Sequence, residues 1–275
     1  MRCASLAPVM GRVVAIANQK GGVGKTTTAI SLAAALAIAE RPTLLIDLDA
    51  QCSATKGLGL KAGPAGDMYS ALSGEVPMSE ILIPTELEYL SVAPASRDLV
   101  GIELEMVSSE GREFRLKSAI ESVRDRFDYI LIDCPPSLGL LTVNAMAAAD
   151  GLLIPVQCEY FALEGVSQMV ETLQRIQAAL NPALVIDGVL LTMFDQRANL
   201  SRQVVHELRE YFKEKVYKAV VPRNVRLGEA PSFGRPIMLY DIRSRGADAY
   251  MNLAREVIRS YEKTSTRERT QQPHP

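Results

Sequence analysis

A glycine-rich segment near the start of the chain, Lys20-Gly-Gly-Val-Gly-Lys-Thr-Thr27, constrains the possible folds more than any other feature. It follows a short apolar run at residues 12–17 and precedes a helical pattern at residues 26–39. Binding a polyphosphate requires several backbone N–H groups that converge on one anion, glycines where side chains would block the approach, and a helix N-terminus aimed at the charge. Because a strand, this loop and a helix meet these needs, the segment predicts a P-loop.

The loop residues have different expected tasks in binding ATP and Mg²⁺. Lys25 brings a positive charge to the β- and γ-phosphates, and the hydroxyl of Thr26 is a ligand for Mg²⁺. The loop departs from the usual pattern because Gln19 stands where a first glycine is common, and a second lysine, Lys20, follows it. The expected nucleotide-binding residues are Lys20, Gly21, Gly22, Val23, Gly24, Lys25, Thr26 and Thr27.

Acidic residues end two further apolar runs. Asp133 ends the run 128–133, and Asp47 and Asp49 end the run that begins at Pro42. The carboxyl ends of parallel strands face the ligand crevice, so Asp133 is expected to hold the Mg²⁺ shell. Since side chains alternate along a strand, Asp47 and Asp49 are expected on one face, where one of them polarises the attacking water.

The order of apolar runs and helical patterns predicts an α/β fold, a doubly wound and mostly parallel sheet of the P-loop NTPase type with helices on both faces. Strands are expected at 12–17, 42–47, 89–93, 128–133, 151–156 and 185–193, and helices at 26–39, 163–180 and 247–261. We expect an N-terminal extension at 1–11, a single ATPase domain at 12–262 and a disordered polar tail at 263–275. Met10 is an alternative start to Met1.

Composition narrows the class of protein. No apolar h-region follows Met1, and the longest apolar stretch is interrupted by Asn144 and Asp150, so we expect neither a secretory signal nor a membrane span. The four cysteines contain no C-x-x-C pair and suggest neither a zinc site nor a disulfide framework. Residues 191–260 carry 13 lysines and arginines against 8 acidic residues, whereas the whole chain has a net charge of −2. This uneven charge indicates an anionic partner for the basic part.

Several motifs together resemble one family. The loop with its extra lysine is similar to that of the deviant Walker-A ATPases, which include the ParA/Soj partition proteins, MinD and the nitrogenase iron protein. Four stretches of this chain resemble the ParA/Soj branch in particular: Asp47-Leu-Asp-Ala-Gln51, Ile132-Asp-Cys-Pro-Pro-Ser137, residues 155–165 and residues 222–234. These motifs span nearly the whole chain.

The resemblance implies roles for five residues around the nucleotide. Lys20 corresponds to the signature lysine that reaches across a dimer interface to the partner's ATP, and Lys25 to the phosphate lysine of its own site. Thr26 is then the Mg²⁺ ligand, Asp133 supports the metal shell, and Asp49 positions the hydrolytic water. Catalysis is thereby assigned to Asp49, Lys20 and Lys25.

The same resemblance assigns residues outside the phosphate site. Pro222 and Asn224 correspond to positions that line the adenine. Arg197 and Arg226 correspond to arginines on the DNA-facing surface of the dimer. Surface salt bridges with neighbouring acids, Asp241 among them, are the alternative role for such arginines.

Three functions remain open at this point. The first is a DNA-segregation ATPase of the cytoplasm and nucleoid, a homodimer with ATP that binds DNA without sequence preference and is weakly active unless a ParB-type partner stimulates it. The second is a MinD-like regulator of division-site placement, although residues 264–275 lack the bulky apolar residues that a membrane-binding helix needs. The third is an iron protein with Cys134 and Cys158 as cluster ligands. Chromosomal and plasmid members share these motifs, so the cargo is not distinguished.

Overall fold

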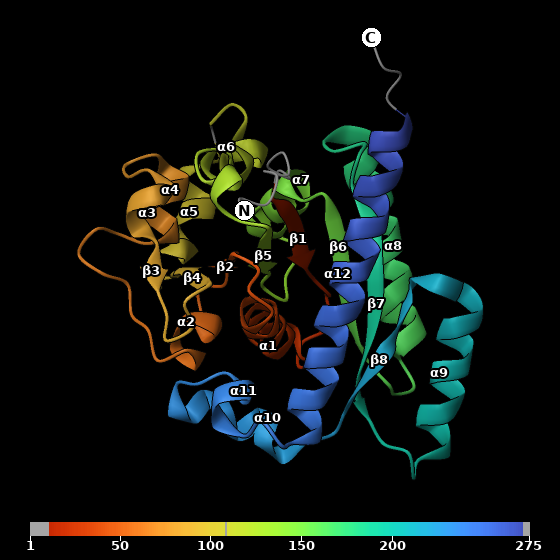
Figure 1. The fold of residues 1–275 in the computed structure, drawn as a ribbon. Coiled ribbons are helices and arrows are strands. Elements are labelled where there is room, and N and C mark those ends of the chain that lie inside the picture. The colour runs from red at the N-terminus through yellow and green to blue at the C-terminus, as the bar shows by residue number, and fades with distance from the viewer. Residues whose placement is uncertain (1–10, 108, 272–275) are drawn as a thin grey trace.

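The computed structural model describes residues 11–107 and 109–271. Within these ranges the chain forms one eight-stranded sheet in the order β3-β4-β2-β5-β1-β6-β7-β8 (Figure 1). Every neighbouring pair is parallel except β3 and β4 at one edge. The strands are β1 (Arg12–Ile16), β2 (Thr43–Asp47), β3 (Ile83–Pro84), β4 (Leu90–Ala93), β5 (Tyr129–Asp133), β6 (Gly151–Gln157), β7 (Val185–Phe194) and β8 (Val216–Pro222).

Helices cover both faces of this sheet. The helices are α1 (Lys25–Ile38), α2 (Ser53–Gly57), α3 (Met68–Ser73), α4 (Met78–Ile81), α5 (Leu99–Glu105), α6 (Arg115–Glu121), α7 (Leu140–Ala148), α8 (Ala162–Ala179), α9 (Asn199–Phe212), α10 (Val225–Glu229), α11 (Ile237–Tyr240) and α12 (Arg245–Gln271). The doubly wound fold expected from the sequence is therefore confirmed.

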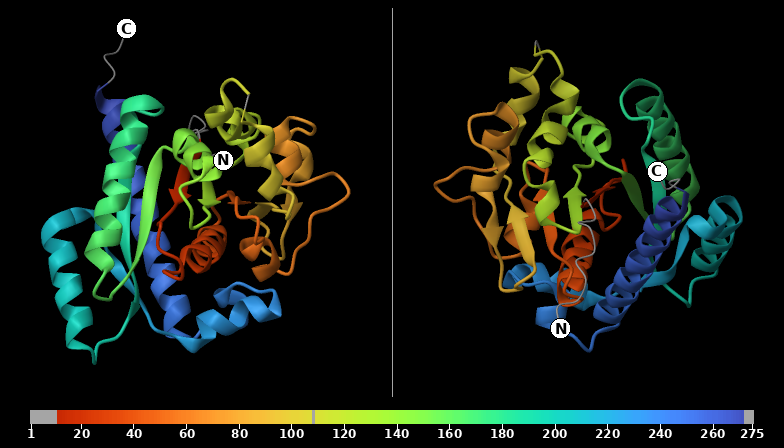
Figure 2. Two further views of the ribbon diagram at one scale, coloured as in Figure 1. Left: turned by 180° about the vertical axis from the view of Figure 1, so that it is seen from behind. Right: turned by 45° about the horizontal axis from the view of Figure 1, so that its top comes forward.

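Alternating side chains of the central strands divide the core into two halves. In β1, Val13 packs with residues of α3 to α9, whereas the neighbouring Val14 packs with α1 and α12 on the opposite face. Figure 1 looks onto the face with α12, and the left view of Figure 2 shows the other face with the green helices α7 and α8. Strands with both faces buried need apolar residues at nearly every position, which explains the continuous apolar runs of the sequence.

Helix α1 lies between the sheet and α12. It is rich in alanine and buried on nearly all sides, which small residues permit because they let a second helix approach closely. The hydroxyl groups of Thr28 in α1 and Tyr250 in α12 are hydrogen-bonded at 3.0 Å, and both side chains are fully or almost fully buried. The helix that follows the P-loop is thus fixed directly to the C-terminal helix.

Strand β8 forms the other edge of the sheet, and α12 covers it. The backbone amides of Lys218 and Ala219 donate to the two carboxylate oxygens of Glu256 at 2.8 and 2.7 Å. These bonds coincide with the irregular register between β7 and β8. A side chain of α12 therefore satisfies backbone groups of the edge strand.

The structure differs from the sequence expectations in several elements. Strands β3 and β8 and helices α9 to α11 were not predicted, and the backbone of α12 continues to Gln271 where a disordered tail was expected from residue 263. The helix continues because residues 262–271 contain strong helix formers such as glutamate, arginine and glutamine and neither glycine nor proline. The expected N-terminal extension lies outside the described residues except for Gly11.

Candidate nucleotide site

The glycine loop joins β1 to α1 at the carboxyl edge of the sheet. Gly22 and Gly24 have φ values of 74° and 90°, in the left-handed region that glycine adopts without strain, and Gly24 is the N-cap of α1. Gly21 and Gly22 are exposed, whereas Val23 is 1% exposed and anchors the loop in the protein. The backbone is therefore open to an anion on one side and packed on the other.

Lys25 lies inside this loop. Its side chain is buried, and its Nζ donates to the backbone oxygen of Lys20 at 3.1 Å, so that it spans the loop from end to start. Burial lowers the pKa of Lys25, and the nearby carboxylate of Asp133 opposes that effect. A buried ammonium at a helix N-terminus gives the loop a strong attraction for a polyphosphate.

Lys20 is held in its own chain by an acidic residue that the sequence analysis did not assign. Its Nζ forms an ion pair with Glu159, which follows β6, and both side chains are partly exposed. Its backbone amide donates to Asn18 Oδ1 at 3.0 Å. The extra lysine of the loop therefore has an intrachain partner at the surface of the site.

Asp133 has a fully buried carboxylate at the end of β5. Neither oxygen has a hydrogen-bond partner within normal geometry among the described residues, although the hydroxyl of Thr26 is near enough to favour the charged form. Burial raises the pKa of Asp133 well above its ordinary value, and the charge of Asp47 adds to this effect. Buried carboxylate oxygens are rarely left without partners, and a hydroxyl beside a carboxylate is a donor set that suits Mg²⁺.

Asp47 and Asp49 differ from the expectation that both lie on one face of a strand. β2 ends at Asp47, so Asp49 belongs to the following turn, where its Oδ1 accepts from the amide of Gln51 at 2.9 Å. Asp47 is fully buried, and its Oδ2 accepts from the amide and hydroxyl of Thr55 at 2.8 and 2.7 Å. Asp47 thus fixes the start of α2, and the half-buried Asp49 remains the one closer to solvent.

Three further side chains support the loop, and no motif identified them. Asn18 is buried and donates to the backbone oxygen of Pro155 in β6 at 2.8 Å. Gln19 donates to Thr172 of α8 at 3.1 Å, and Thr192 of β7 donates to the backbone oxygen of Val23 at 2.8 Å. In the sequence, a polar residue within an otherwise apolar run is the signal that could have identified Thr192.

The residues expected to line the adenine lie at the end of β8. Pro222 is its last residue and is the register partner of Phe194 in β7. Asn224 is the N-cap of α10, and its side chain accepts from the amide of Arg226 at 2.9 Å. The structure thus gives Asn224 a capping role and places both residues at the carboxyl end of a strand of the same sheet.

The two arginines expected at a DNA-facing surface lie in the segments that follow the neighbouring strands β7 and β8. Arg197 lies between β7 and α9 and is exposed, and among the described residues no ion pair involves it. Arg226 lies in α10 and pairs with Glu229 at 2.9 Å and with Asp241 at 3.6 Å. The backbone amide of Arg223 donates to the oxygen of Phe194 at 3.1 Å and joins the loops. The salt-bridge alternative thus applies to Arg226.

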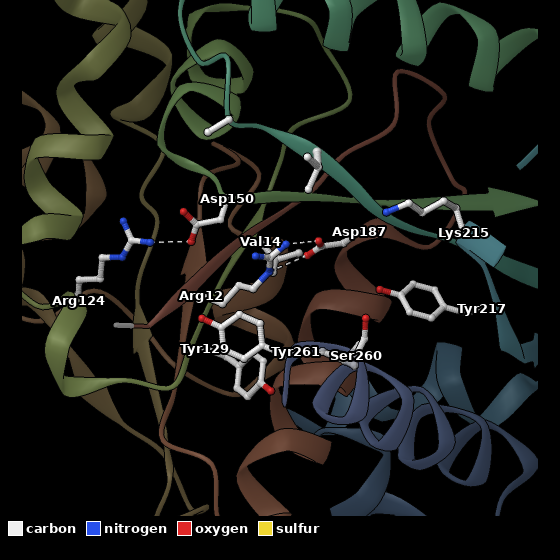
Figure 3. A pocket seen from close by; sticks show the side chains of 13 residues that line it. Arg12, Val14, Arg124, Tyr129, Asp150, Asp187, Lys215, Tyr217, Ser260 and Tyr261 are labelled. Atoms are coloured by element: carbon white, nitrogen blue, oxygen red, sulfur yellow. Dashed lines mark hydrogen bonds and ion pairs between the residues drawn. The ribbon is translucent and has the colours of Figure 1, made fainter. Parts of the chain in front are cut away.

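A cavity of about 570 Å³ lies at the opposite, amino edge of the sheet (Figure 3). Four of the charged groups in it are paired with one another, since Arg12 bonds to Asp187, and Arg124 bonds to Asp150 at 2.6 Å; Lys215 also lines the cavity. These pairs connect the starts of β1, β6 and β7. None of the residues expected to bind the nucleotide lines this cavity.

The cysteines proposed as cluster ligands are buried thiols. Burial raises the pKa of Cys158 to about 11 and raises that of Cys134 further, which disfavours the thiolate form that a metal requires. In the described part of the chain, no group of three or more histidine, cysteine or acidic side chains is placed to hold a metal ion. No helix within the same ranges has the length and apolar character needed to cross a bilayer.

The fold and this site together define a P-loop NTPase, because the glycine loop with Lys25 joins the first strand to the first helix of a doubly wound parallel sheet. The AAA domain family matches residues 11–186. Chromosome partitioning protein ParA of Myxococcus xanthus is 56% identical over 261 residues, which are 94% of this chain and 92% of that protein. Sporulation initiation inhibitor protein Soj of Bacillus subtilis is 55% identical over 90% of this chain and 98% of that protein. The chain belongs to the ParA/Soj family of chromosome-partitioning ATPases.

Solved structures of similar proteins show the same fold. Cobyrinic acid a,c-diamide synthase from Mycobacterium smegmatis with bound ADP and magnesium has a TM-score of 0.80 and 37% identity, covering 92% of this chain and 96% of that chain. Cell division ATPase MinD of Pyrococcus furiosus has a TM-score of 0.74 and 27% identity, covering 91% and 99%. Since these proteins carry different names on one fold, the fold alone does not decide the function.

Proposed function

We propose that this protein is an ATPase of DNA segregation. ATP closes two copies of the chain into a sandwich dimer, the dimer binds DNA without sequence preference, and a ParB-type partner stimulates an otherwise weak hydrolysis. The nucleotide part of the proposal is carried by the buried carboxylate of Asp133, whose oxygens lack partners beside Lys25 and Thr26. The segregation part is supported by relatives that are more than half identical over nearly their full length.

Thr26 and Asp133 fit a magnesium ion that accompanies ATP. The hydroxyl and the unpartnered carboxylate would hold it, and the ion supplies charge that offsets the phosphates. The backbone amides of residues 21–27 and the ammonium of Lys25 bind the phosphates. Asp49 is the carboxylate that orients the attacking water, because it is more exposed than the fully buried Asp47 and Asp133 at the ends of β2 and β5.

Lys20 reaches the nucleotide of the other copy in the dimer. Its Nζ is paired with Glu159 within one chain, and both side chains are partly exposed, so the pair can open at modest cost. The partner's phosphates then replace Glu159 as the counter-charge. Pro222 and Asn224 are proposed to contact the adenine after β8, with Asn224 using groups that its bond to Arg226 leaves available.

The DNA-binding surface is proposed to include Arg197 and Arg226. Arg197 lies in the loop after β7 and Arg226 in the short helix α10 after β8, and guanidinium groups contact phosphates well from such positions. A two-fold dimer doubles this surface, so DNA affinity depends on ATP. This activity places the protein in the cytoplasm at the nucleoid, with chromosomal or plasmid DNA as cargo.

A titration of duplex DNA with and without ATP tests this function. The parent is expected to bind several unrelated sequences alike, and only with ATP. Arg197→Ala should weaken binding on every sequence and reduce the salt dependence by about one phosphate contact. Arg126→Ala is the matched control, because Arg126 is also exposed but lies just before β5 at the amino edge.

The controls separate the steps of the proposal. Both variants should bind ATP like the parent. DNA binding by the parent that is equally strong without ATP would contradict the dimer mechanism, and loss of binding in Arg126→Ala alone would place the surface elsewhere. Stimulation of hydrolysis by a ParB-type protein is measured in the same solutions, and a lack of stimulation would remove that partner from the proposal.

A further inference from the structure

A hydrogen bond joins the phosphate loop to a strand that carries no part of the recognised motif. The hydroxyl of Thr192 in β7 donates to the backbone oxygen of Val23 at 2.8 Å. Thr192 is 2% exposed and Val23 is 1% exposed, so water does not compete for this bond. A buried backbone oxygen in a loop with few internal bonds depends strongly on its one side-chain donor.

The bond determines which way the next amide points. In a trans peptide the C=O and N–H groups point in opposite directions, so a Val23 oxygen turned toward β7 turns the N–H of Gly24 toward the open side of the loop. Gly24 has φ 90°, lies two residues after the exposed Gly22 and directly precedes the buried Lys25. The N–H of Gly24 therefore faces the side where an anion can approach.

Thr192 itself is fixed from two sides. It is the register partner of Gln157 in β6, and its backbone oxygen accepts from the amide of Cys158 at 3.2 Å. Its methyl carbon Cγ2 would lie 3.9 Å from a Cβ atom at Gly24, so the side chain lies directly beneath the loop. The hydroxyl thus has one fixed position relative to Val23.

The backbone changes direction immediately after this residue. Met193 has φ 51°, a left-handed conformation that is costly for a residue other than glycine. The register between β7 and β8 shifts between Leu191 and Phe194. Such strain persists where the surrounding structure requires it, and here it follows the residue that holds the phosphate loop.

We propose that Thr192 is a positioning residue of the nucleotide site. Its hydroxyl holds the oxygen of Val23 and thereby aims the N–H of Gly24 at the phosphates, without touching the ligand. The proposal rests on the nucleotide binding proposed above. Without this bond the peptide between Val23 and Gly24 populates the flipped orientation in the free protein, and the apparent Kd for nucleotide rises by the inverse of the fraction that is still correctly oriented.

The test compares two changes at Thr192 with one at a distant threonine. Thr192→Val keeps the shape but removes the donor, and Thr192→Ser keeps the donor but removes a methyl group. Thr43→Val is the matched control, because Thr43 is also fully buried and its hydroxyl donates to a backbone oxygen, that of Arg41, at 2.8 Å, at the amino edge of β2. Calorimetric titrations with ATP and ADP give Kd, steady-state kinetics give KM and kcat, and thermal melts give stability.

Thr192→Val is expected to raise the Kd for both nucleotides about tenfold. KM should rise by the same factor, and kcat should stay within about twofold of the parent. ATP and ADP respond alike because the loop amides contact the phosphates that both contain. Thr192→Ser should keep the Kd of the parent even where its melting temperature falls. Thr43→Val should also keep the Kd of the parent, although this variant loses a similar hydrogen bond.

Three results would overturn the assignment: a Kd of Thr192→Val within twofold of the parent, an equal weakening in Thr192→Ser, or an equal weakening in Thr43→Val. The first means that the bond does not orient the loop, and the other two mean that the effect is one of general stability. Failure of the parent to bind ATP is a separate result, which would reject the proposed function before any variant is compared.

Discussion

Replacing Asp133 with asparagine is expected to make the nucleotide-free protein more stable while removing its response to Mg²⁺. The carboxylate of Asp133 is fully buried, its oxygens have no hydrogen-bond partner in the described ranges, and the charge of Asp47 lies nearby. An amide of the same shape removes the buried charge and its repulsion. The same change removes the anionic ligand that the site offers to a metal ion.

The size of the effect follows from the missing partners. An unpartnered buried charge costs more than the about 1–3 kcal/mol of a neutral polar group, and the amide still leaves neutral polar atoms without partners, so the net relief is taken as about 2 kcal/mol. A chain of 275 residues has an unfolding entropy near 0.6 kcal/mol/K, so the melting temperature should rise by about 3–4 °C. In the parent, Mg²⁺ with ADP at about 100 times Kd adds about 2.7 kcal/mol.

Thermal melts in ADP with Mg²⁺ or with EDTA provide the assay. The parent should melt higher with Mg²⁺ than with EDTA, and Asp133→Asn should show no difference between the two. Asp47→Asn is the matched control, since Asp47 is equally buried but accepts from the amide and hydroxyl of Thr55. That variant should lose about 1–3 kcal/mol. A lower melting temperature for nucleotide-free Asp133→Asn, or a retained response to Mg²⁺, would refute the reasoning.

The same variant should also change the dependence of stability on pH. Burial raises the pKa of Asp133 in the folded state, so the folded chain keeps this proton where the unfolded chain, with a pKa of about 3.9, has lost it. The stabilising effect of the proton is full below about pH 3.9 and is lost as the pH rises toward the folded pKa. The gain in melting temperature of Asp133→Asn over the parent should therefore grow with pH above about 4 and then level off.

Three other predictions test the roles proposed for the lysines and Asp49. Lys25→Ala should abolish ATP binding in a calorimetric titration, because the loop loses its buried positive charge; an unchanged affinity would contradict the P-loop assignment. In sedimentation experiments with ATP, Asp49→Ala should be trapped as a dimer and Lys20→Ala should stay monomeric, and the reverse pattern would exchange their roles. Glu159→Gln should dimerise with ATP at lower protein concentration than the parent, because Lys20 then has no intrachain ion pair to break. The free energy of unfolding should change by less than about 1 kcal/mol, because the pair is partly exposed.

The central sheet and the phosphate loop were predictable because their signals are local. Apolar runs bounded by glycine, proline or aspartate identified β1, β2, β5, β6 and β7, and the spacing of glycines and Lys25 identified the loop. Strand β8 was missed because Tyr217 and Lys218 interrupt its apolar residues, as befits an edge strand that α12 covers on one side. Its place in the sheet depends on contacts with distant parts of the chain.

The support of the site was not predictable from the sequence for a similar reason. Thr192 lies within an apolar strand 169 residues from its partner Val23, and Glu159 lies 139 residues from Lys20. Asp47 and Asp49 were correctly placed at the carboxyl edge, but their orientations depend on where β2 ends. No spacing rule predicts which acid bonds to Thr55 and which one stays near solvent.

The bonds from the amides of Lys218 and Ala219 to Glu256 affect how copies of this chain can associate. An exposed edge strand offers free amides and carbonyls to any passing strand, and sheets that grow by this route form open-ended polymers. Here a carboxylate of α12 already occupies two of those amides. A strand arriving at β8 would have to displace a charged hydrogen-bond acceptor, so growth of the sheet past this edge is disfavoured. The dimer proposed above forms through the nucleotide-bearing face instead, so the carboxylate of Glu256 at β8 does not oppose it.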